Sequence, residues 1–234
     1  EMSKVLVYRL LVVCALIISA CSTTKYVPEN DKLYLGADVK IDDKDVKKQT
    51  KKDLESDLEA LTRPRPNSSI LGIRFKLMMH NLRNERNKGM GSWLSRKFGE
   101  APVLFSTVKV DFNRDLIANR LENRGYFRAT DTTDTAYKGD KKVKLIYHAT
   151  AGPQYMINSV KFTTDSSDLG SAVSGTEANT FLKAGDPYSL DAIKAERTRI
   201  DAALKEQGFY FFNSEDILVQ VDSTNNIHQV DMYV

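Results

Sequence analysis

The feature that most constrains the fold of this chain is a two-fold repeat within its own sequence. Tyr34-x4-Val39-Lys40-Ile41 recurs 121 residues later as Tyr155-x4-Val160-Lys161-Phe162. A second matched set, at an offset of 83 residues, pairs Ser106, Val110, Arg114, Ile117, Leu121, Gly125 and Tyr126 with Ser189, Ile193, Arg197, Ile200, Leu204, Gly208 and Phe209. Both copies keep one order, so the sequence predicts two units of the same fold, with 38 extra residues (121 − 83) in the first.

The second matched set predicts a long helix in each copy. Its apolar residues recur at helical spacing and therefore lie on one face. Ser106 and Ser189 precede these residues, and a serine hydroxyl can accept a hydrogen bond from a free amide of the first helical turn. Gly125 and Gly208 follow the last apolar position, where a left-handed residue commonly ends a helix.

A strand pair is expected after each helix. In the second copy, Ile217, Val219 and Val221 occupy every second position before a turn at 222–226, and apolar alternation resumes at residue 230. With the strand that opens each copy, this gives a three-stranded sheet with helices on one face. The expected fold class is therefore α+β.

The 38 extra residues are assigned to the segment 63–100, which is strongly basic. It contains nine Lys or Arg residues against Glu85 and Glu100, together with large apolar residues. Two interpretations stay open: a helical pair that packs on the first copy, or a surface that contacts an anionic membrane or an acidic partner. The candidate contact residues are Arg74, Lys76, Arg83, Arg86, Lys88, Trp93, Arg96 and Lys97.

The first 20 residues have the pattern of a secretory signal peptide. Lys4 and Arg9 precede nine residues without charge, and Ile18-Ser19-Ala20-Cys21 follows them. This order predicts cleavage before Cys21 and attachment of a lipid to its thiol, with residues 21–31 as a tether. Because Cys14 is removed with the signal, the predicted mature chain has no disulfide.

No motif predicts an enzyme, a metal site or a cofactor site. The histidines are His80, His148 and His228, and none has a partner at metal-ligand spacing. No Gly-x-Ser-x-Gly segment is present, and the glycines of 88–92 lack the Gly-Lys-Ser/Thr ending of a phosphate loop. A secretory signal together with a net charge of only +3 argues against nucleic acid as a partner.

Several segments of the sequence resemble known proteins. Lys183-Ala184-Gly185-Asp186-Pro187-Tyr188-Ser189 and Gly152-Pro153-x-Tyr155-x-Ile157 are similar to segments of the polypeptide-transport-associated (POTRA) domain. The stretches at 21–36, 70–76 and 93–102 resemble TamL-type lipoproteins of the BamA superfamily of outer-membrane assembly factors. The resemblance covers nearly the whole chain.

The resemblance implies a domain organisation, a location and a class of partner. Two tandem POTRA-like domains, each a small three-stranded mixed sheet covered by helices on one face, would occupy residues 32–151 and 152–234. The first domain would carry the helical insertion at 63–100. The implied location is the periplasmic side of the outer membrane, held by the lipid. The implied partners are outer-membrane protein clients and either a TamB-like inner-membrane protein or the BAM machinery.

Clients would bind at a sheet edge, in the strand that follows each glycine–aromatic pair. These strands are expected at roughly 126–137 and 215–221, with Ile217, Val219 and Val221 as the candidate binding residues. The family also implies a membrane β-barrel further along the chain, which these 234 residues do not contain. Two other functions stay open: a stand-alone periplasmic lipoprotein that binds envelope components, and a lipid-anchored hydrolase with an unrecognised site.

Overall fold

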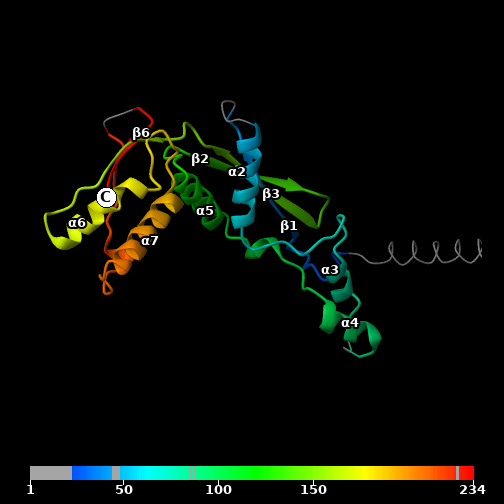
Figure 1. The fold of residues 1–234 in the computed structure, drawn as a ribbon. Coiled ribbons are helices and arrows are strands. Elements are labelled where there is room, and N and C mark those ends of the chain that lie inside the picture. The colour runs from blue at the N-terminus through cyan, green and yellow to red at the C-terminus, as the bar shows by residue number, and fades with distance from the viewer. Residues whose placement is uncertain (1–22, 44–47, 85, 87, 225–226) are drawn as a thin grey trace, which may run out of the picture. The chain divides into compact units, whose positions relative to one another are not determined.

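The computed structural model describes residues 23–43, 48–84, 86, 88–224 and 227–234 (Figure 1). The predicted signal peptide and Cys21 lie outside these residues, so cleavage and lipidation stay predictions. Within the described part of the chain, no helix is both long enough and apolar enough to cross a membrane. The elements are β1 (Leu33–Ile41), α2 (Lys48–Leu61), α3 (Phe75–His80), α4 (Met90–Phe98), η1 (Phe105–Thr107), α5 (Val110–Asn123), β2 (Thr130–Tyr137), β3 (Lys142–Thr150), β4 (Met156–Lys161), α6 (Asp168–Gly175), η2 (Glu177–Asn179), α7 (Leu190–Glu206), η3 (Ser214–Asp216), β5 (Gln220–Asp222) and β6 (Gln229–Tyr233).

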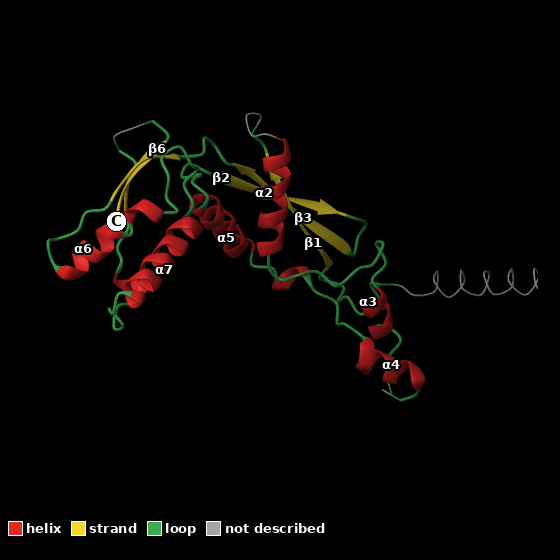
Figure 2. Cartoon of the chain, viewed as in Figure 1, coloured by secondary structure: helices red, strands yellow, loops and turns green. Residues whose placement is uncertain are grey.

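In the described residues, two three-stranded sheets form the framework, and both have the same strand order. Figure 2 shows the strands in yellow. The orders β1-β3-β2 and β4-β6-β5 place the last strand of each copy in the centre. In the second sheet, β4 runs parallel and β5 antiparallel to β6. In the first sheet, β1 and β3 are parallel, because Leu33 N–H donates to Lys141 O and Asp42 N–H donates to Ala149 O. These mixed sheets confirm the predicted α+β fold class.

The first sheet buries one face of its central strand β3. Val143, Leu145, Tyr147 and Ala149 are each at most 1% exposed, and the residues between them are half-buried, which is the period-two pattern of a strand. The Asn113 side chain, at the start of α5, donates a 3.1 Å hydrogen bond to the Tyr147 hydroxyl. The buried face of β3 is therefore the face towards the beginning of α5.

In the second sheet, α6 and α7 lie on the same face (Figure 1). The predicted apolar face of α7 is confirmed, because Ile193, Ile200 and Leu204 are at most 5% exposed. Ile200 and Leu204 form a cluster with Ile217, against which α6 packs Leu169 and Val173. This cluster explains how a chain segment without a disulfide can hold its helices on a small sheet.

Most of the predicted signals for the start and end of the helices are confirmed, and one is wrong. Ser189 caps α7 by accepting a hydrogen bond from Ala192 N–H at 3.3 Å, as expected. Gly125 and Gly208 have φ of +84° and +97°, so both are the left-handed residues that the sequence predicted after the helices. Ser106 does not cap α5. It lies in η1 and donates from its hydroxyl to Asp31 Oδ2 at 2.5 Å, and α5 begins four residues later.

The closing strand pair of the second copy is shorter than predicted. Residues 217–219 have no regular structure, and β5 begins only at Gln220. The preceding η3 is stabilised by a reciprocal capping box between Asn213 and Asp216, and Arg197 Nε donates to Ser214 O at 2.8 Å. These side-chain contacts hold the backbone in a turn where alternation alone indicated an extended chain.

The described chain groups into two compact units. One comprises the chain up to Lys40 with Glu55–Asn113 and Thr133–Tyr147, and the other comprises Ile41–Leu54, Arg114–Thr132 and His148–Val234. These units interleave along the sequence. The division of the chain into domains at 32–151 and 152–234 therefore stays a prediction.

Candidate interaction surfaces

Edge strand β1 has outward backbone groups that are covered by other parts of the chain. Tyr34 N–H donates to Val103 O at 2.8 Å, and Val39 N–H donates to the Glu59 carboxylate at 3.1 Å. An uncovered edge strand can pair with another chain. Because these amides already have partners, β1 is poorly suited to bind an added strand at these positions.

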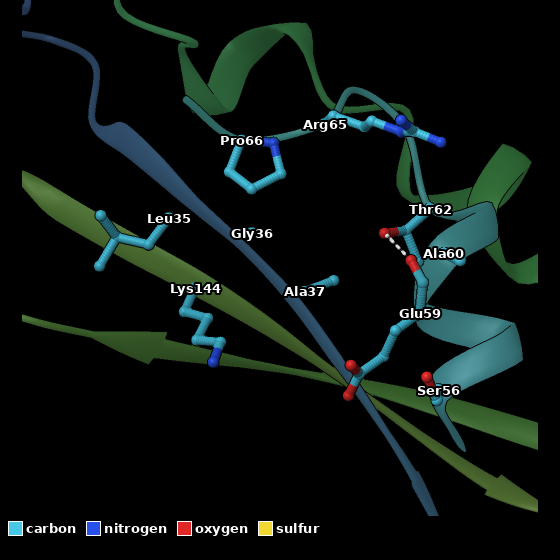
Figure 3. A pocket seen from close by; sticks show the side chains of 10 residues that line it. All are labelled: Leu35, Gly36, Ala37, Ser56, Glu59, Ala60, Thr62, Arg65, Pro66 and Lys144. Carbon is cyan, nitrogen blue, oxygen red and sulfur yellow. Dashed lines mark hydrogen bonds between the residues drawn. The ribbon is translucent and has the colours of Figure 1, made fainter. Parts of the chain in front are cut away.

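A pocket of about 460 Å³ lies beside this covered edge, between β1, the end of α2 and the chain at 65–66 (Figure 3). Lys144 lines it and lies 2.6 Å from the carboxylate of Asp38. Glu59 lines it as well, binds the β1 amide, and accepts the Thr62 hydroxyl at its backbone carbonyl at 2.9 Å. Through this ion pair and these hydrogen bonds, Lys144 and Glu59 connect the structural elements around the pocket. Their geometry indicates a structural role and no catalytic one.

Strand β5, at the edge of the second sheet, has outward backbone groups that are uncovered in the described part of the chain, unlike those of β1. Val234 N–H donates to Lys161 O at 2.9 Å, so Val234 directs its backbone groups towards β4. Backbone direction alternates along a strand, and Met232 therefore also faces β4. Val221 is paired with Met232 in the antiparallel register. It is thus a non-hydrogen-bonded position, and its N–H and C=O point away from β6 towards the open edge.

The predicted edge residues Ile217, Val219 and Val221 direct their side chains into the protein. Ile217 is 8% exposed, and Val219 and Val221 are half-buried against the core clusters of the second sheet. Leu218, between them, is 77% exposed. Of the three, Val221 can offer a ligand its backbone groups, because Ile217 N–H already donates to Ser214 O. The exposed apolar side chain beside the edge is Leu218.

An apolar groove of about 370 Å³ opens beside the start of this edge strand. It lies between α6 and the segment 212–218. Its apolar walls are formed by Leu169 and Val173 of α6, by Phe212 and Ile217, and by Val234. The groove and the outward backbone of β5 are neighbouring features, because Ile217 and Leu218 line the groove and lead directly into the strand.

The basic insertion contains the predicted helical pair, α3 and α4, and it has a buried side. Leu77 of α3 is fully buried and packs with Val27 and Leu33. Arg74 is a predicted contact residue, but its Nη2 donates to Leu35 O at 3.2 Å, and burial lowers its pKa. The other predicted contact residues are exposed: Lys76, Arg83, Arg86, Lys88, Trp93, Arg96 and Lys97.

Histidine and carboxylate side chains form no compact cluster in the described part of the chain. No group of three or more His, Cys, Asp or Glu residues there could hold a metal ion. His148 of β3 lies 3.1 Å from the Asp42 carboxylate. His228 occupies a turn just before β6, with φ of +55°.

Among known proteins, similarity to this chain is found in solved structures. A scan against protein-family models finds no match, and a search of the curated proteins finds none. The chain is similar to POTRA3–5 of Haemophilus influenzae BamA, with 15% identity over 89% of this chain and 67% of that chain and a TM-score of 0.43. It is also similar to the N-terminal domain of Omp85 from Thermosynechococcus elongatus, with 12% identity over 88% of this chain and 97% of that one and a TM-score of 0.26.

A third similar structure is longer than this chain. It is BamA from Haemophilus ducreyi lacking POTRA domains 1–3, with 21% identity and a TM-score of 0.37. The match covers 65% of this chain but only 26% of that one. These three similar structures thus come from BamA and Omp85 proteins. All three TM-scores are below 0.5.

Sequence reasoning missed several residues of these surfaces. The sequence did not single out the groove residues Leu169, Val173 and Phe212, because residue spacing does not show which side of α6 stays open. Tyr26 was assigned to the tether, yet its hydroxyl donates to Arg83 O at 2.7 Å in the insertion. The aromatic Tyr26 and the apolar Val27 within a mainly polar tether were the available indication of such a contact.

Proposed function

We propose that this chain is the periplasm-facing, lipid-anchored region of an envelope assembly factor that binds client proteins. The proposal is supported by the POTRA-like sequence segments and by a strand order that occurs in both sheets. Under this proposal, Cys21 carries the lipid at the outer membrane. A TamB-like protein of the inner membrane or the BAM machinery would be the partner with which the chain works.

The observation that carries client binding is the open backbone of β5 next to an apolar groove. An extended peptide that pairs with the N–H and C=O of Val221 would add a fourth strand to the second sheet. Such a peptide alternates its side chains, so apolar residues on one face could reach Leu218 and the groove. Segments destined to become barrel strands have this alternation, which makes unfolded outer-membrane proteins suitable clients.

Client binding can be tested with a labelled peptide of about ten residues that alternates apolar and polar side chains. Val221→Pro removes the outward amide without removing a hydrogen bond of the sheet, and proline is tolerated at edge strands. We expect it to weaken peptide binding by at least about tenfold, the effect of losing roughly 1.4 kcal/mol. Fluorescence anisotropy gives the dissociation constants.

The matched control is Val160→Pro, which alters β4 at the opposite edge of the same sheet. Val160 alternates with Lys161, whose carbonyl faces β6, so the Val160 amide also points outwards. Circular dichroism should show both variants folded. If both prolines leave binding unchanged, β5 is not the client edge; if both weaken it equally, binding does not discriminate between the edges.

The proposed lipid anchor has its own test, because Cys21 lies outside the described residues. Radiolabelled palmitate should enter the wild-type chain and should not enter Cys21→Ser. The Ile-Ser-Ala-Cys junction at 18–21 motivates this expectation. Equal labelling of both chains would remove the anchor from the proposal and leave client binding to be judged by itself.

A further inference from the structure

Helix α4 of the basic insertion has its small polar side chains inside and three of its four large apolar side chains, those of Met90, Trp93 and Phe98, outside. Ser92 and Ser95 are 1% and 6% exposed. The Ser95 hydroxyl donates to His80 O at 2.9 Å, and the Ser92 hydroxyl donates to Asn84 Oδ1 at 3.2 Å. Met90 on the outer side is 79% exposed. A helix that only covers the protein core would have the reverse distribution.

Close packing fixes this orientation of α4. A Cβ added to Gly91 would lie 2.6 Å from Leu82 O, and a Cβ added to Gly99 would lie 2.8 Å from His80 Cα. The inner side of α4 therefore has room only for small residues. Rotation of the helix to bury its apolar side chains would bring larger groups into these backbone contacts, so their exposure is built into the packing.

The outer side of α4 combines aromatic rings with a cation. Met90, Trp93 and Lys97 are three and four residues apart and so lie along one stripe. Trp93 and Phe98 are 48% and 51% exposed, and their ring centroids are 6.2 Å apart. Lys97 Nζ lies 5.2 Å from the Trp93 ring and 5.6 Å from the Phe98 ring. Amphipathic tryptophan and a long lysine are typical of side chains that enter a lipid headgroup region.

A second apolar group projects from the turn before α3. Ile70 and Ile73 exchange backbone hydrogen bonds of 3.0 and 2.9 Å, which closes a two-residue turn. Leu71 and Gly72 occupy this turn with φ of +50° and +79°. Asparagine or glycine is the favoured residue at such a position, yet here it is leucine, with 98% of its side chain exposed. The turn thus presents an apolar side chain against the local backbone preference.

Charge and apolar exposure coincide in this segment. Residues 63–100 contain nine Lys or Arg and two Glu residues. The same segment holds eight of the fifteen large apolar side chains that are exposed in the described part of the chain. One of its two acidic residues, Glu100, is bound to the Ser68 hydroxyl at 2.8 Å. This combination is complementary to a surface that is negatively charged outside and apolar beneath.

The first described residues of the chain are held against this same segment. The Tyr26 hydroxyl donates to Arg83 O at 2.7 Å, and the Arg83 guanidinium carbon lies 4.4 Å from the centre of the Tyr26 ring. Val27, the next residue, is 4% exposed and packs with Leu77. Cys21 is five residues before Tyr26, and five extended residues span at most about 18 Å. A lipid on Cys21 would therefore keep the insertion close to the bilayer.

We propose that the insertion docks directly on an anionic lipid surface, with Leu71, Met90, Trp93 and Phe98 entering the headgroup region. The exposed lysines and arginines then face lipid phosphates. The inference rests on the proposed lipid anchor for its location in the cell, but the contact itself needs no lipidation. It gives the chain a second membrane contact, which orients the region next to the tether. An acidic protein partner is the competing occupant and is one outcome of the test.

The experiment uses unlipidated residues 22–234, which include every described residue. Trp93 is the single tryptophan of the chain, so fluorescence excited selectively at tryptophan, and not at the tyrosines, reports on the proposed contact. With vesicles of phosphatidylglycerol and phosphatidylethanolamine, we expect a blue shift and protection from a water-soluble quencher. Phosphatidylcholine vesicles should produce neither effect. Binding should weaken as salt rises, because screening reduces attraction between surface charges.

The apolar contact is tested by a variant that keeps the Trp93 reporter. Leu71→Asn with Met90→Gln removes two exposed apolar side chains, and asparagine suits the left-handed turn position. Vesicle co-sedimentation should fall by at least about tenfold. The matched control replaces Tyr210 and Phe211, which are 73% and 104% exposed in the other unit, by glutamine and asparagine. Its binding should equal wild type.

The charge contribution is tested by two triple Lys/Arg→Gln variants with the same change in net charge. The first removes exposed cations of the insertion, at Lys76, Arg86 and Lys97. The control removes exposed cations elsewhere, at Lys52, Lys183 and Lys194. We expect the first variant to lose at least about tenfold in vesicle binding and most of its salt dependence, and the control to lose much less.

Three outcomes would overturn the inference. The first is unchanged Trp93 fluorescence with anionic vesicles. The second is an equal loss of affinity in both triple variants, which would indicate a diffuse charge effect. Thirdly, the insertion variants could bind vesicles normally but fail to pull down an acidic protein, which would assign the surface to that partner. Palmitate labelling of Cys21 is independent of all three, so failure of the docking surface is distinguishable from failure of the anchor.

Discussion

Tyr34 and Tyr147 are equally buried, but their hydroxyl groups differ in hydrogen bonding. Both side chains are fully buried. The Tyr147 hydroxyl accepts a hydrogen bond from Asn113 Nδ2 at 3.1 Å, whereas the Tyr34 hydroxyl has no partner among the described residues. Burial, together with the nearby Tyr147, raises the pKa of Tyr34. An unpaired buried hydroxyl costs free energy, because it has lost water without gaining a protein partner.

This difference predicts opposite effects for one chemical change. Tyr34→Phe should leave the free energy of unfolding unchanged or raise it by up to about 1 kcal/mol, since it removes an unpaired polar atom. Tyr147→Phe should lower it by about 1 kcal/mol, since the Asn113 amide loses an acceptor. Urea unfolding followed by circular dichroism measures both. A larger loss in Tyr34→Phe than in Tyr147→Phe would contradict the assignment.

Glu196 is a buried charge of α7 with a full set of partners. It accepts hydrogen bonds from the Thr180 hydroxyl at 2.9 Å, from Phe181 N–H at 2.9 Å and from Arg199 Nη2 at 2.6 Å. Burial tends to raise its pKa, but the hydrogen bonds from Arg199, Phe181 and Thr180 outweigh burial and lower it. The carboxylate thus ties the segment after η2 to the helix.

A lowered pKa in the folded protein has a defined effect on stability. The contribution of Glu196 is fully present above its unfolded-state pKa of about 4.5 and is lost as pH falls through the lower folded pKa. Glu196→Gln should cost about 3 kcal/mol near pH 7, because it leaves Arg199 largely buried without its charge partner. Its unfolding free energy should also fall less steeply than that of wild type below pH 4.5. Parallel slopes for both proteins would contradict this linkage.

At the scale of elements, α7 is held by an apolar stripe whose phase the sequence already indicated. Leu204→Ala should lower the free energy of unfolding by about 2–5 kcal/mol, because Leu204 is fully buried between α6 and the sheet. Phe211→Ala is the control. Phe211 is 104% exposed, and its truncation should change stability by less than about 0.5 kcal/mol. Equal losses for both would mean that the helix packs in another phase.

At the scale of the whole molecule, the insertion is both a structural part and a surface. Replacing residues 63–100 by a short Gly/Ser linker should remove Leu77 from the cluster with Val27 and Leu33. It should also remove Asn67, whose side chain accepts from Val103 N–H at 2.9 Å. We therefore expect a folded protein with a lower Tm and faster amide exchange in β1, while exchange in β6 is unchanged. Wild-type stability would show that the insertion adds nothing to the first sheet.

Some features follow from sequence because they depend on local chemistry. The phase of α7, its Ser189 cap and the glycines after α5 and α7 needed only side-chain spacing and backbone preference. Local chemistry misled at Ser106, since Asp31, 75 residues away in the chain, took the hydroxyl that was expected to cap α5. At η3, the capping box and Arg197 likewise outweighed the alternation that indicated a strand.

The sequence by itself determined the two-fold α+β architecture, because a repeat of apolar spacing and turn residues leaves few ways to bury its faces. It also indicated a basic, aromatic insertion. Only the tertiary structure decided which backbone edge is open and which side of α4 faces solvent. Those outcomes depend on contacts between residues distant in sequence, such as Glu59 with Val39 and Ser95 with His80. Residue spacing along the sequence does not indicate such contacts, so only the folded structure reveals them.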